Sequence, residues 1–312
     1  MQLDGIHHIT CITRDAPRNV DFYARVLGLR MVKKTVNQDD PRAYHLFYAD
    51  EAGSPGADIT FFEWPDLPPG RAGAGMVAAI VHRVASEDAL AFWEERLTRE
   101  GAPVERSPGR LRFANPEGLA HELAVVETAD PPLVARSAEV PEEHAIQGFD
   151  SVRALVADVA HSEAMVRQVL GFTPAGERTW ESRGEHRGSR ITFERAAEWG
   201  VQGGGTVHHI AWSAARADLD GWRERIMAVG GRPTPVIDRF WFESVYFREP
   251  SGILYELATR DGAGFAADEP AERLGERLTL PPDFEHLRDE LERELTPLPD
   301  VRRWRPGAPA AP

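Results

Sequence analysis

Two adjacent histidine pairs and one late glutamate are the residues of this sequence that best suit metal chemistry. The pairs are His7-His8 in IHHIT and His208-His209 in VHHIAW, and the glutamate is Glu256 in ILYEL. Imidazole and carboxylate ligands suit Fe(II) or Mn(II), and a set of three leaves further coordination positions open. The chain has a single cysteine, which excludes a cysteine-based zinc or iron–sulfur cluster. A metal site here must use histidine and carboxylate.

Strand alternation assigns different roles to the two members of each pair. His8 and His209 fall on faces that also carry small and polar residues, whereas His7 and His208 fall on the opposite, more apolar faces. We therefore predict that His8, His209 and Glu256 form a two-histidine, one-carboxylate triad. His7 and His208 are predicted to orient the ligands or to move protons.

The elements that must position these residues recur four times along the chain. Each copy begins with an alternating strand, continues with an amphipathic helix and ends with further strands, the last rich in β-branched or aromatic residues. The helix ends FYARVLG and VRQVLG match, as do RFANPEGLAHEL and YFREPSGILYEL. The copies cover about 6–65, 76–127, 148–194 and 206–259. A βαβββ module of this size cannot bury its own sheet face, so modules must pair.

The histidines predict which modules pair. Only modules 1 and 4 keep them in their first strand; module 3 has Asp150-Ser151 there, and a helix-based alignment sets Ile80 of module 2 opposite His209. One shared site therefore requires module 1 to pair with module 4 and module 2 with module 3, although sequence neighbours usually pair. The predicted fold is α+β, with four βαβββ modules forming two half-open mixed β-barrels with flanking helices.

The repeats also predict boundaries along the chain. We predict a first domain of modules 1 and 2 over 1–130, a proline-bearing linker over 131–147, and a second domain of modules 3 and 4 over 148–260. A C-terminal helical extension and tail follow over 261–312. Apolar residues in this extension share one face of a predicted helix and favour a packing or dimer element; they are Phe284, Leu287, Leu291 and Leu295. A homodimer or higher homo-oligomer is compatible with this pattern.

Composition narrows the class of protein. The chain has 312 residues, with 42% hydrophobic and 28% charged, as in ordinary globular proteins rather than disordered ones. The net charge of −14 repels phosphate backbones and argues against nucleic-acid binding. No apolar run approaches the roughly 20 residues that span a bilayer. The N-terminus carries no secretory pattern, so we expect a cytoplasmic protein without membrane partners.

With these motifs in place, residues of about 3–260 resemble the vicinal oxygen chelate superfamily, also called the glyoxalase/bleomycin-resistance/extradiol-dioxygenase fold. Within it, the early IHHIT, late VHHIAW and final YEL resemble ring-cleaving dioxygenases of the hydroquinone dioxygenase type. The resemblance implies an Fe(II)-dependent enzyme, with Mn(II) as an alternative, that opens a dihydroxylated aromatic ring with O2. Both oxygen atoms would enter the product.

The resemblance also implies roles for individual residues. His8, His209 and Glu256 match the family's metal ligands. Other positions match residues around the substrate, namely His7, Thr10, His208, Arg239 and Tyr246. A guanidinium and a phenol close to Glu256 could stabilise negative charge and donate a proton. We therefore predict His7, His208, Arg239 and Tyr246 as catalytic, and Thr10, Glu63, Phe240 and Phe242 as lining the substrate pocket.

Glu63, at the end of ITFFEW, keeps a second class of enzyme open. As a fourth ligand it would leave fewer open positions, as in glyoxalase-type lyases or isomerases that act through Zn(II) or Ni(II), and strand parity does not decide its direction. A third alternative is a non-catalytic binding protein of the bleomycin-resistance kind, although such a protein needs no metal ligands. The sequence leaves the ring substituents, the metal and the oligomeric state open.

Overall fold

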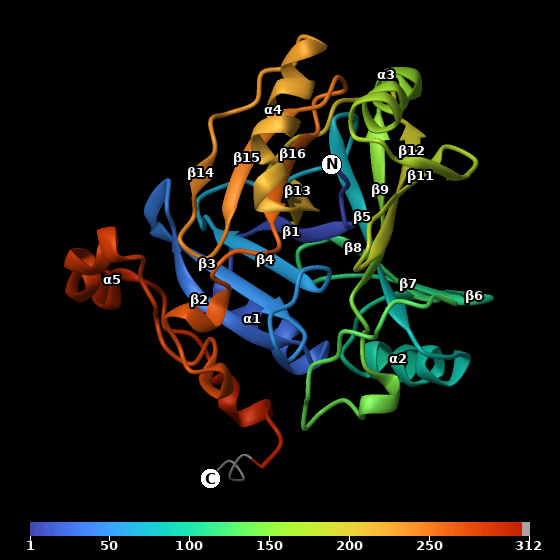
Figure 1. Ribbon diagram of the computed structural model, residues 1–312. Coiled ribbons are helices and arrows are strands. Elements are labelled where there is room, and N and C mark those ends of the chain that lie inside the picture. The colour runs from blue at the N-terminus through green and yellow to red at the C-terminus, as the bar shows by residue number, and fades with distance from the viewer. Residues whose placement is uncertain (308–312) are drawn as a thin grey trace.

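Modules 1 and 4 together form one eight-stranded mixed sheet, called here the first sheet. The structure, a computed structural model, describes residues 1–307 (Figure 1). Module 1 contributes β1 (Ile6–Thr13), β2 (Arg30–Asn37), β3 (Asp40–Ala49) and β4 (Asp58–Glu63), and module 4 contributes β13 (Thr206–Ala214), β14 (Ile237–Asp238), β15 (Glu243–Arg248) and β16 (Leu254–Thr259). The strand order is β14-β15-β16-β13-β1-β4-β3-β2, so β1 and β13 meet at the centre.

Modules 2 and 3 form the second sheet, also of eight strands. Module 2 contributes β5 (Met76–Val84), β6 (Val104–Ser107), β7 (Arg110–Ala114) and β8 (Ala120–Val125), and module 3 contributes β9 (Phe149–Val156), β10 (Thr173–Gly176), β11 (Thr179–Arg183) and β12 (Gly188–Arg195). Its order is β10-β11-β12-β9-β5-β8-β7-β6. The predicted pairing of modules 1 with 4 and 2 with 3 is confirmed. Each sheet takes one module from each side of the predicted linker, so neither predicted domain, 1–130 or 148–260, forms a sheet of its own.

Each module carries its helix between its first two long strands. The helices are α1 (Ala16–Val20), α2 (Glu87–Arg99), α3 (Val159–Ala164) and α4 (Leu219–Ala228), and π-helical turns continue α1 and α3 over Asp21–Val26 and Met165–Val169. Asp15 caps α1 by accepting from the Arg18 backbone N–H, and Gly28 takes the left-handed conformation after the helical segment. Large aromatic side chains fill the layer between helices and sheets, with Trp93 and Trp222 almost fully buried.

A β-bulge interrupts strand one of every module. Between β1 and β13, His8 pairs with Ala211 and Ile6 with Trp212, which leaves His7 without a partner; His208 is skipped in the same way on β13. The pairing of β5 with β9 skips Ala78 and Asp150. A bulge places two successive side chains toward one side of a sheet. The prediction that His7 and His208 take the faces opposite to their neighbours is therefore wrong.

The C-terminal extension packs against the first sheet of its own chain. Its helix α5 (Arg288–Glu294) lies near β2 in Figure 1, and Leu291 and Leu295 are buried. Lys33, fully buried on β2, binds Asp268 at 2.8 Å and Glu269 at 2.5 Å. The apolar face predicted for packing or dimerisation thus contacts the chain's own core. None of the described helices is long and apolar enough to cross a membrane. The end of the predicted tail, 308–312, lies outside the described residues.

Candidate metal centre

The structure brings His8, His209 and Glu256 together at the centre of the first sheet, although they come from opposite ends of the chain. The Glu256 Oε2 atom lies 3.2 Å from His8 Nε2 and 2.9 Å from His209 Nε2, and the two nitrogens are 3.4 Å apart. All three side chains are buried. Glu256 Oε2 makes no hydrogen bond among the described residues. Ligands about 2.1 Å from one cation lie roughly 3 Å from each other, so these three fit a divalent metal.

Each candidate ligand histidine is held by its bulged neighbour. The Nδ1 atoms of His7 and His8 are 3.0 Å apart, and those of His208 and His209 are 2.8 Å apart. A histidine that binds metal through Nε2 carries its proton on Nδ1, so His8 and His209 would donate to their neighbours. His7 and His208 must then accept through Nδ1 and carry a proton on Nε2. The bulges thus let adjacent residues fix the orientation of both ligands.

The two neighbouring histidines differ in what their other nitrogen can reach. His7 lies against the Thr259 backbone and does not line the pocket. His208 does line the pocket, and its Nε2 has no hydrogen-bond partner among the described residues. Burial, together with the neighbouring His8 or His209, lowers the pKa of each to about 3, so both are neutral near pH 7. Of the two, His208 is the one positioned to exchange a proton with a bound molecule.

Charge within the centre is set mainly by Glu256. Burial opposes ionisation of this carboxyl, but His8 and His209 outweigh it and hold its pKa well below the usual range. Burial would also lower the pKa of His8, yet Glu256 raises it above its ordinary value. Asp58 pairs with His8 in the register of β1 and β4 and is buried without a hydrogen-bond partner among the described residues. Burial raises the pKa of Asp58 to about 8, so Glu256 is the ionised carboxylate here at neutral pH.

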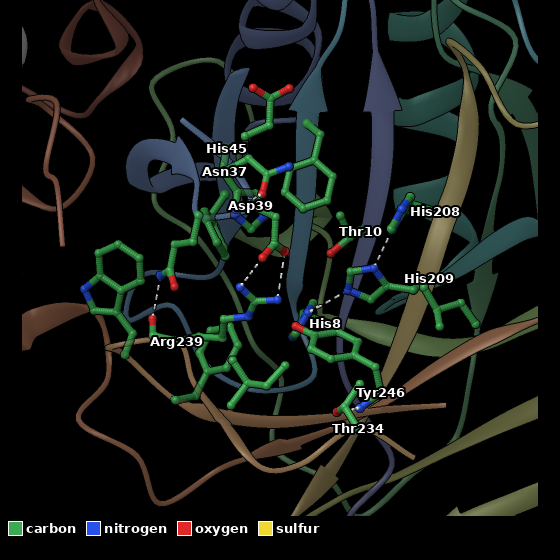
Figure 2. Close-up of a pocket in the computed structure, with 18 of the residues that line it drawn as sticks. His8, Thr10, Asn37, Asp39, His45, His208, His209, Thr234, Arg239 and Tyr246 are labelled. Atoms are coloured by element: carbon green, nitrogen blue, oxygen red, sulfur yellow. Dashed lines mark hydrogen bonds and ion pairs between the residues drawn. The ribbon is translucent and has the colours of Figure 1, made fainter. Parts of the chain in front are cut away.

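A pocket of about 540 Å³ opens above the centre (Figure 2). Aromatic side chains form much of its wall, namely Phe47, Phe62, Trp64, Trp241 and Phe242. Its polar residues include Thr10, Asn37, His45, His208, Arg239 and Tyr246. Trp241 is supported from behind, because its Nε1 donates to Asp268 of the C-terminal extension at 3.0 Å. The first sheet and the extension together therefore build an apolar pocket with a few polar groups, as small-molecule sites commonly have.

Arg239 and Tyr246 lie side by side in this pocket. Arg239 stands in the turn between β14 and β15, rather than on a strand, and its guanidinium lies 5.4 Å from the centre of the Tyr246 ring. Both Nη atoms of Arg239 donate to the exposed Asp39 carboxylate, at 2.9 and 3.2 Å (Figure 2). Burial and the Glu256 carboxylate raise the pKa of Tyr246, so its hydroxyl keeps its proton. The pair offers a fixed positive charge and a neutral donor.

Two predicted pocket residues do not line the pocket. Glu63 instead accepts a hydrogen bond from the Ala16 backbone N–H at 2.9 Å, at the start of α1. The amide groups at a helix start attract a carboxylate, which explains its direction. Phe240 takes a left-handed backbone conformation (φ 71°) in the turn after Arg239, and the turn presents Trp241 and Phe242 to the pocket in its place. The other two predictions, Thr10 and Phe242, do fall on the pocket wall.

The position that a fourth ligand would need belongs to Thr60. On β13, Glu256 pairs with Ala211, two residues after His209. On β1, Thr60 pairs with Thr10, which lies two residues after His8. Thr60 is therefore the counterpart of Glu256 in module 1. Its hydroxyl donates to Thr10 Oγ1 at 2.8 Å. A hydroxyl in this position leaves three protein ligands, so the arrangement required for a glyoxalase-type fourth carboxylate is not present among the described residues.

Sequence reasoning missed His45, which lines the pocket from β3. Its ring lies between Phe47 and Phe62, with centroids 4.0 and 4.4 Å away. It also missed Ser244, whose hydroxyl donates to Glu256 Oε1. His45 lies between Tyr44 and Leu46 on a predicted strand, and that alternation could have marked it as facing the site, whereas Ser244 follows Glu243 and gives no such signal.

Comparison with known proteins agrees with this architecture. Residues 5–126 and 148–257 match the family model described as the Glyoxalase/Bleomycin resistance protein/Dioxygenase superfamily. The two matched stretches together cover most of the chain. The chain therefore belongs to this superfamily.

Three relatives are similar along nearly their whole length. The chain is 37% identical to "Putative ring-cleaving dioxygenase MhqA" of Bacillus subtilis (strain 168), over 96% of this chain and 100% of that protein. It is 39% identical to "Putative ring-cleaving dioxygenase MhqO" of the same strain, over 94% and 96%. It is 31% identical to "Chlorohydroquinone/hydroquinone 1,2-dioxygenase" of Sphingobium indicum, over 94% and 96%.

Solved structures give the same result for the fold. A crystal structure titled as a putative dioxygenase from Bacillus subtilis superposes with a TM-score of 0.88 at 37% identity, covering 96% of this chain and 98% of that one. Glyoxalase I from Zea mays superposes with a TM-score of 0.57 at 15% identity, covering 82% of this chain and 92% of that one. The second likeness concerns the fold alone.

Proposed function

We propose that this protein is an Fe(II)-dependent dioxygenase that cleaves a hydroquinone-type aromatic ring and inserts both atoms of O2. One observation carries the proposal: His8, His209 and Glu256 converge at the base of an aromatic-walled pocket, with no fourth ligand among the residues that the structure describes. Fe(II), or alternatively Mn(II), held by these three residues would offer open positions to a substrate oxygen and to O2 and transfer electrons between them. The relatives named as ring-cleaving and hydroquinone dioxygenases support this class of reaction.

The residues of the pocket have separable tasks in this reaction. His208 is neutral and presents Nε2 to the pocket, so it can hand a proton to a bound molecule and recover it. His7 makes no contact with the pocket interior and orients His8. The aromatic wall fits a planar ring and excludes water from it.

Arg239 and Tyr246 would act on charge that develops on the ring oxygens. The guanidinium stays positive at every relevant pH and lies over the Tyr246 ring. The Tyr246 hydroxyl keeps its proton because burial and Glu256 raise its pKa, so it can donate a hydrogen bond without losing the proton. Together they would stabilise a phenolate or ring-opened oxyanion.

Oxygen consumption by iron-loaded protein tests this proposal directly. Protein purified without oxygen and loaded with Fe(II) should consume one O2 for each hydroquinone, and the product should contain two labelled atoms when 18O2 is used. Methylglyoxal with a thiol should give no turnover, since a glyoxalase-type reaction consumes no oxygen. Incorporation of one labelled atom, or turnover of the thiohemiacetal instead, would overturn the proposal.

A further inference from the structure

His45 heads a chain of hydrogen bonds that crosses the pocket wall. Its Nε2 lies 2.9 Å from Thr60 Oγ1, and the Thr60 hydroxyl donates to Thr10 Oγ1 at 2.8 Å. These residues stand on β3, β4 and β1, which are neighbouring strands of the first sheet. His45 and Thr10 both line the pocket (Figure 2). The chain therefore starts and ends at the space that a substrate would fill.

The direction of these bonds fixes the tautomer of His45. Thr60 has one hydroxyl proton and gives it to Thr10, so it must accept from His45, whose proton therefore sits on Nε2. Burial, with His8 and His209 nearby, keeps the pKa of His45 well below its ordinary value, and the ring is neutral. His45 Nδ1 then carries a lone pair, and it makes no hydrogen bond to any described residue. The Thr10 hydroxyl, having accepted one bond, is free to donate.

The position of His45 complements that of the triad. His45 and Ser244 hold equivalent positions in the register of the sheet. His45 pairs with Phe62, two residues after Thr60. Ser244 pairs with Ala258, two residues after Glu256. His45 thus occupies, in module 1, the place from which Ser244 supports the metal ligand in module 4. Two strand spacings, about 10 Å along the sheet, separate β3 from β1. His45 is also level with Ile12, four residues beyond His8 along β1, so it stands apart from the triad while lining the same pocket.

We propose that His45 Nδ1 accepts a hydrogen bond from an O–H or N–H group at the end of the aromatic substrate that lies away from His8, His209 and Glu256. This inference rests on the proposed function and defines its substrate class: rings with donors at opposite ends, such as hydroquinones and aminophenols. Catechols are disfavoured, because adjacent hydroxyls would both lie at the triad and leave His45 Nδ1 unpaired. Phe47 and Phe62, which flank the imidazole, hold it in place for this contact.

Binding without turnover tests the subsite. Calorimetry under anaerobic conditions with metal-loaded protein would compare hydroquinone with 4-methoxyphenol, which keeps the far oxygen but lacks its proton. The unmodified protein should prefer hydroquinone by roughly tenfold, the size of one hydrogen bond. In His45→Phe this preference should disappear while the affinity for 4-methoxyphenol stays within about twofold, because the new ring still packs against Phe47 and Phe62.

Two further variants control for shape and stability. His45→Asn places a carbonyl oxygen near the position of Nδ1 and should restore part of the preference. Trp199→Phe alters an exposed aromatic residue that does not line the pocket and should leave the preference unchanged. A preference that persists in His45→Phe, in protein with an unchanged melting temperature, overturns the inference.

The outcome separates this inference from the proposed function. If hydroquinone drives oxygen uptake but His45→Phe keeps its preference, the subsite is wrong and the reaction stands. If oxygen uptake fails but the preference is present and depends on His45, the subsite stands and the reaction is wrong.

Discussion

The two sheets of this protein have the same arrangement of strands, but each neutralises its equivalent buried glutamate in a different way. Both place a glutamate at the same point of the last strand: Glu256 pairs with Ala211 as Glu122 pairs with Val81. In the first sheet, Glu256 meets two imidazoles. In the second, Glu122 is bound by Arg112 at 2.9 Å and by other arginines of the same face, namely Arg110 and Arg153.

The bulged dipeptides explain why the second sheet lacks the two imidazoles of the first. His208-His209 has Ala78-Ala79 as its counterpart, and His7-His8 has Asp150-Ser151. A buried carboxylate without a positive partner is costly, so Glu122 needs positive charge from another source. Guanidinium groups supply that charge from the chain itself. Among the described residues, the first sheet has no arginine bound to Glu256 and sets two imidazoles beside it, an arrangement that suits an exchangeable cation.

The largest expected effect is the loss of metal when Glu256, but not Glu122, is replaced. Glu256→Gln should weaken Fe(II) binding more than about 100-fold, since it removes a charged ligand, whereas loss of an outer hydrogen-bond partner usually costs 10- to 100-fold. Oxygen uptake with hydroquinone should be lost with the metal. Metal analysis after gel filtration and a competition titration measure the change.

Glu122→Gln is the matched control for that variant. It alters the same strand position in the other sheet, and it should keep one metal per chain and normal oxygen uptake. Equal loss of metal in both variants would show that Glu256 and Glu122 do not differ in metal binding.

A second, smaller effect concerns the pH dependence of stability in metal-free protein. Glu256 raises the pKa of His8 against the effect of burial, so the protonated imidazole stabilises the fold at acid pH and this contribution is lost as the pH rises through the raised pKa. Arginines lower the pKa of Glu122 and do not titrate in this range. Glu256→Gln should therefore destabilise metal-free protein more at pH 6 than at pH 9, whereas Glu122→Gln should cost about 1–3 kcal/mol at both.

Urea denaturation with a chelator, at intervals from pH 6 to pH 9, would measure these differences. Since Glu256 stays ionised across this range, its own titration does not enter. A pH-independent cost for Glu256→Gln would mean that His8 is not protonated beside it in the metal-free fold.

Much of this architecture could be predicted because its evidence is local in sequence. The His7-His8 and His208-His209 dipeptides each occupy a recognisable first strand, and one metal site forces their modules together. Glu256 follows from a motif shared with module 2. The pairing of distant modules was therefore accessible without coordinates, and so were the three residues that converge.

The errors arose where backbone register departs from simple alternation. No glycine or proline marks the bulges at His7 and His208, so period-two reasoning sent these side chains to the wrong face. Aligning modules by their helices set Ile80 opposite His209, whereas the strand pairing makes Ala79 the counterpart. The direction of Glu63 depends on where α1 begins beside it, a tertiary contact that strand parity does not contain.

The smallest expected effect contrasts these buried charges with an exposed one. Asp39 is 74% exposed and pairs with Arg239 at 2.9 Å. Because water screens such a pair, Asp39→Asn should change the free energy of unfolding by only about 0.2–1 kcal/mol. Glu95→Gln, which removes the exposed partner of Arg99 on α2, should cost as little. The two should differ in catalysis alone: Asp39→Asn frees Arg239 above Tyr246 and should raise KM for hydroquinone a few-fold, while Glu95→Gln leaves KM unchanged. If KM responds equally in both variants, Asp39 has no role in holding Arg239 over the pocket.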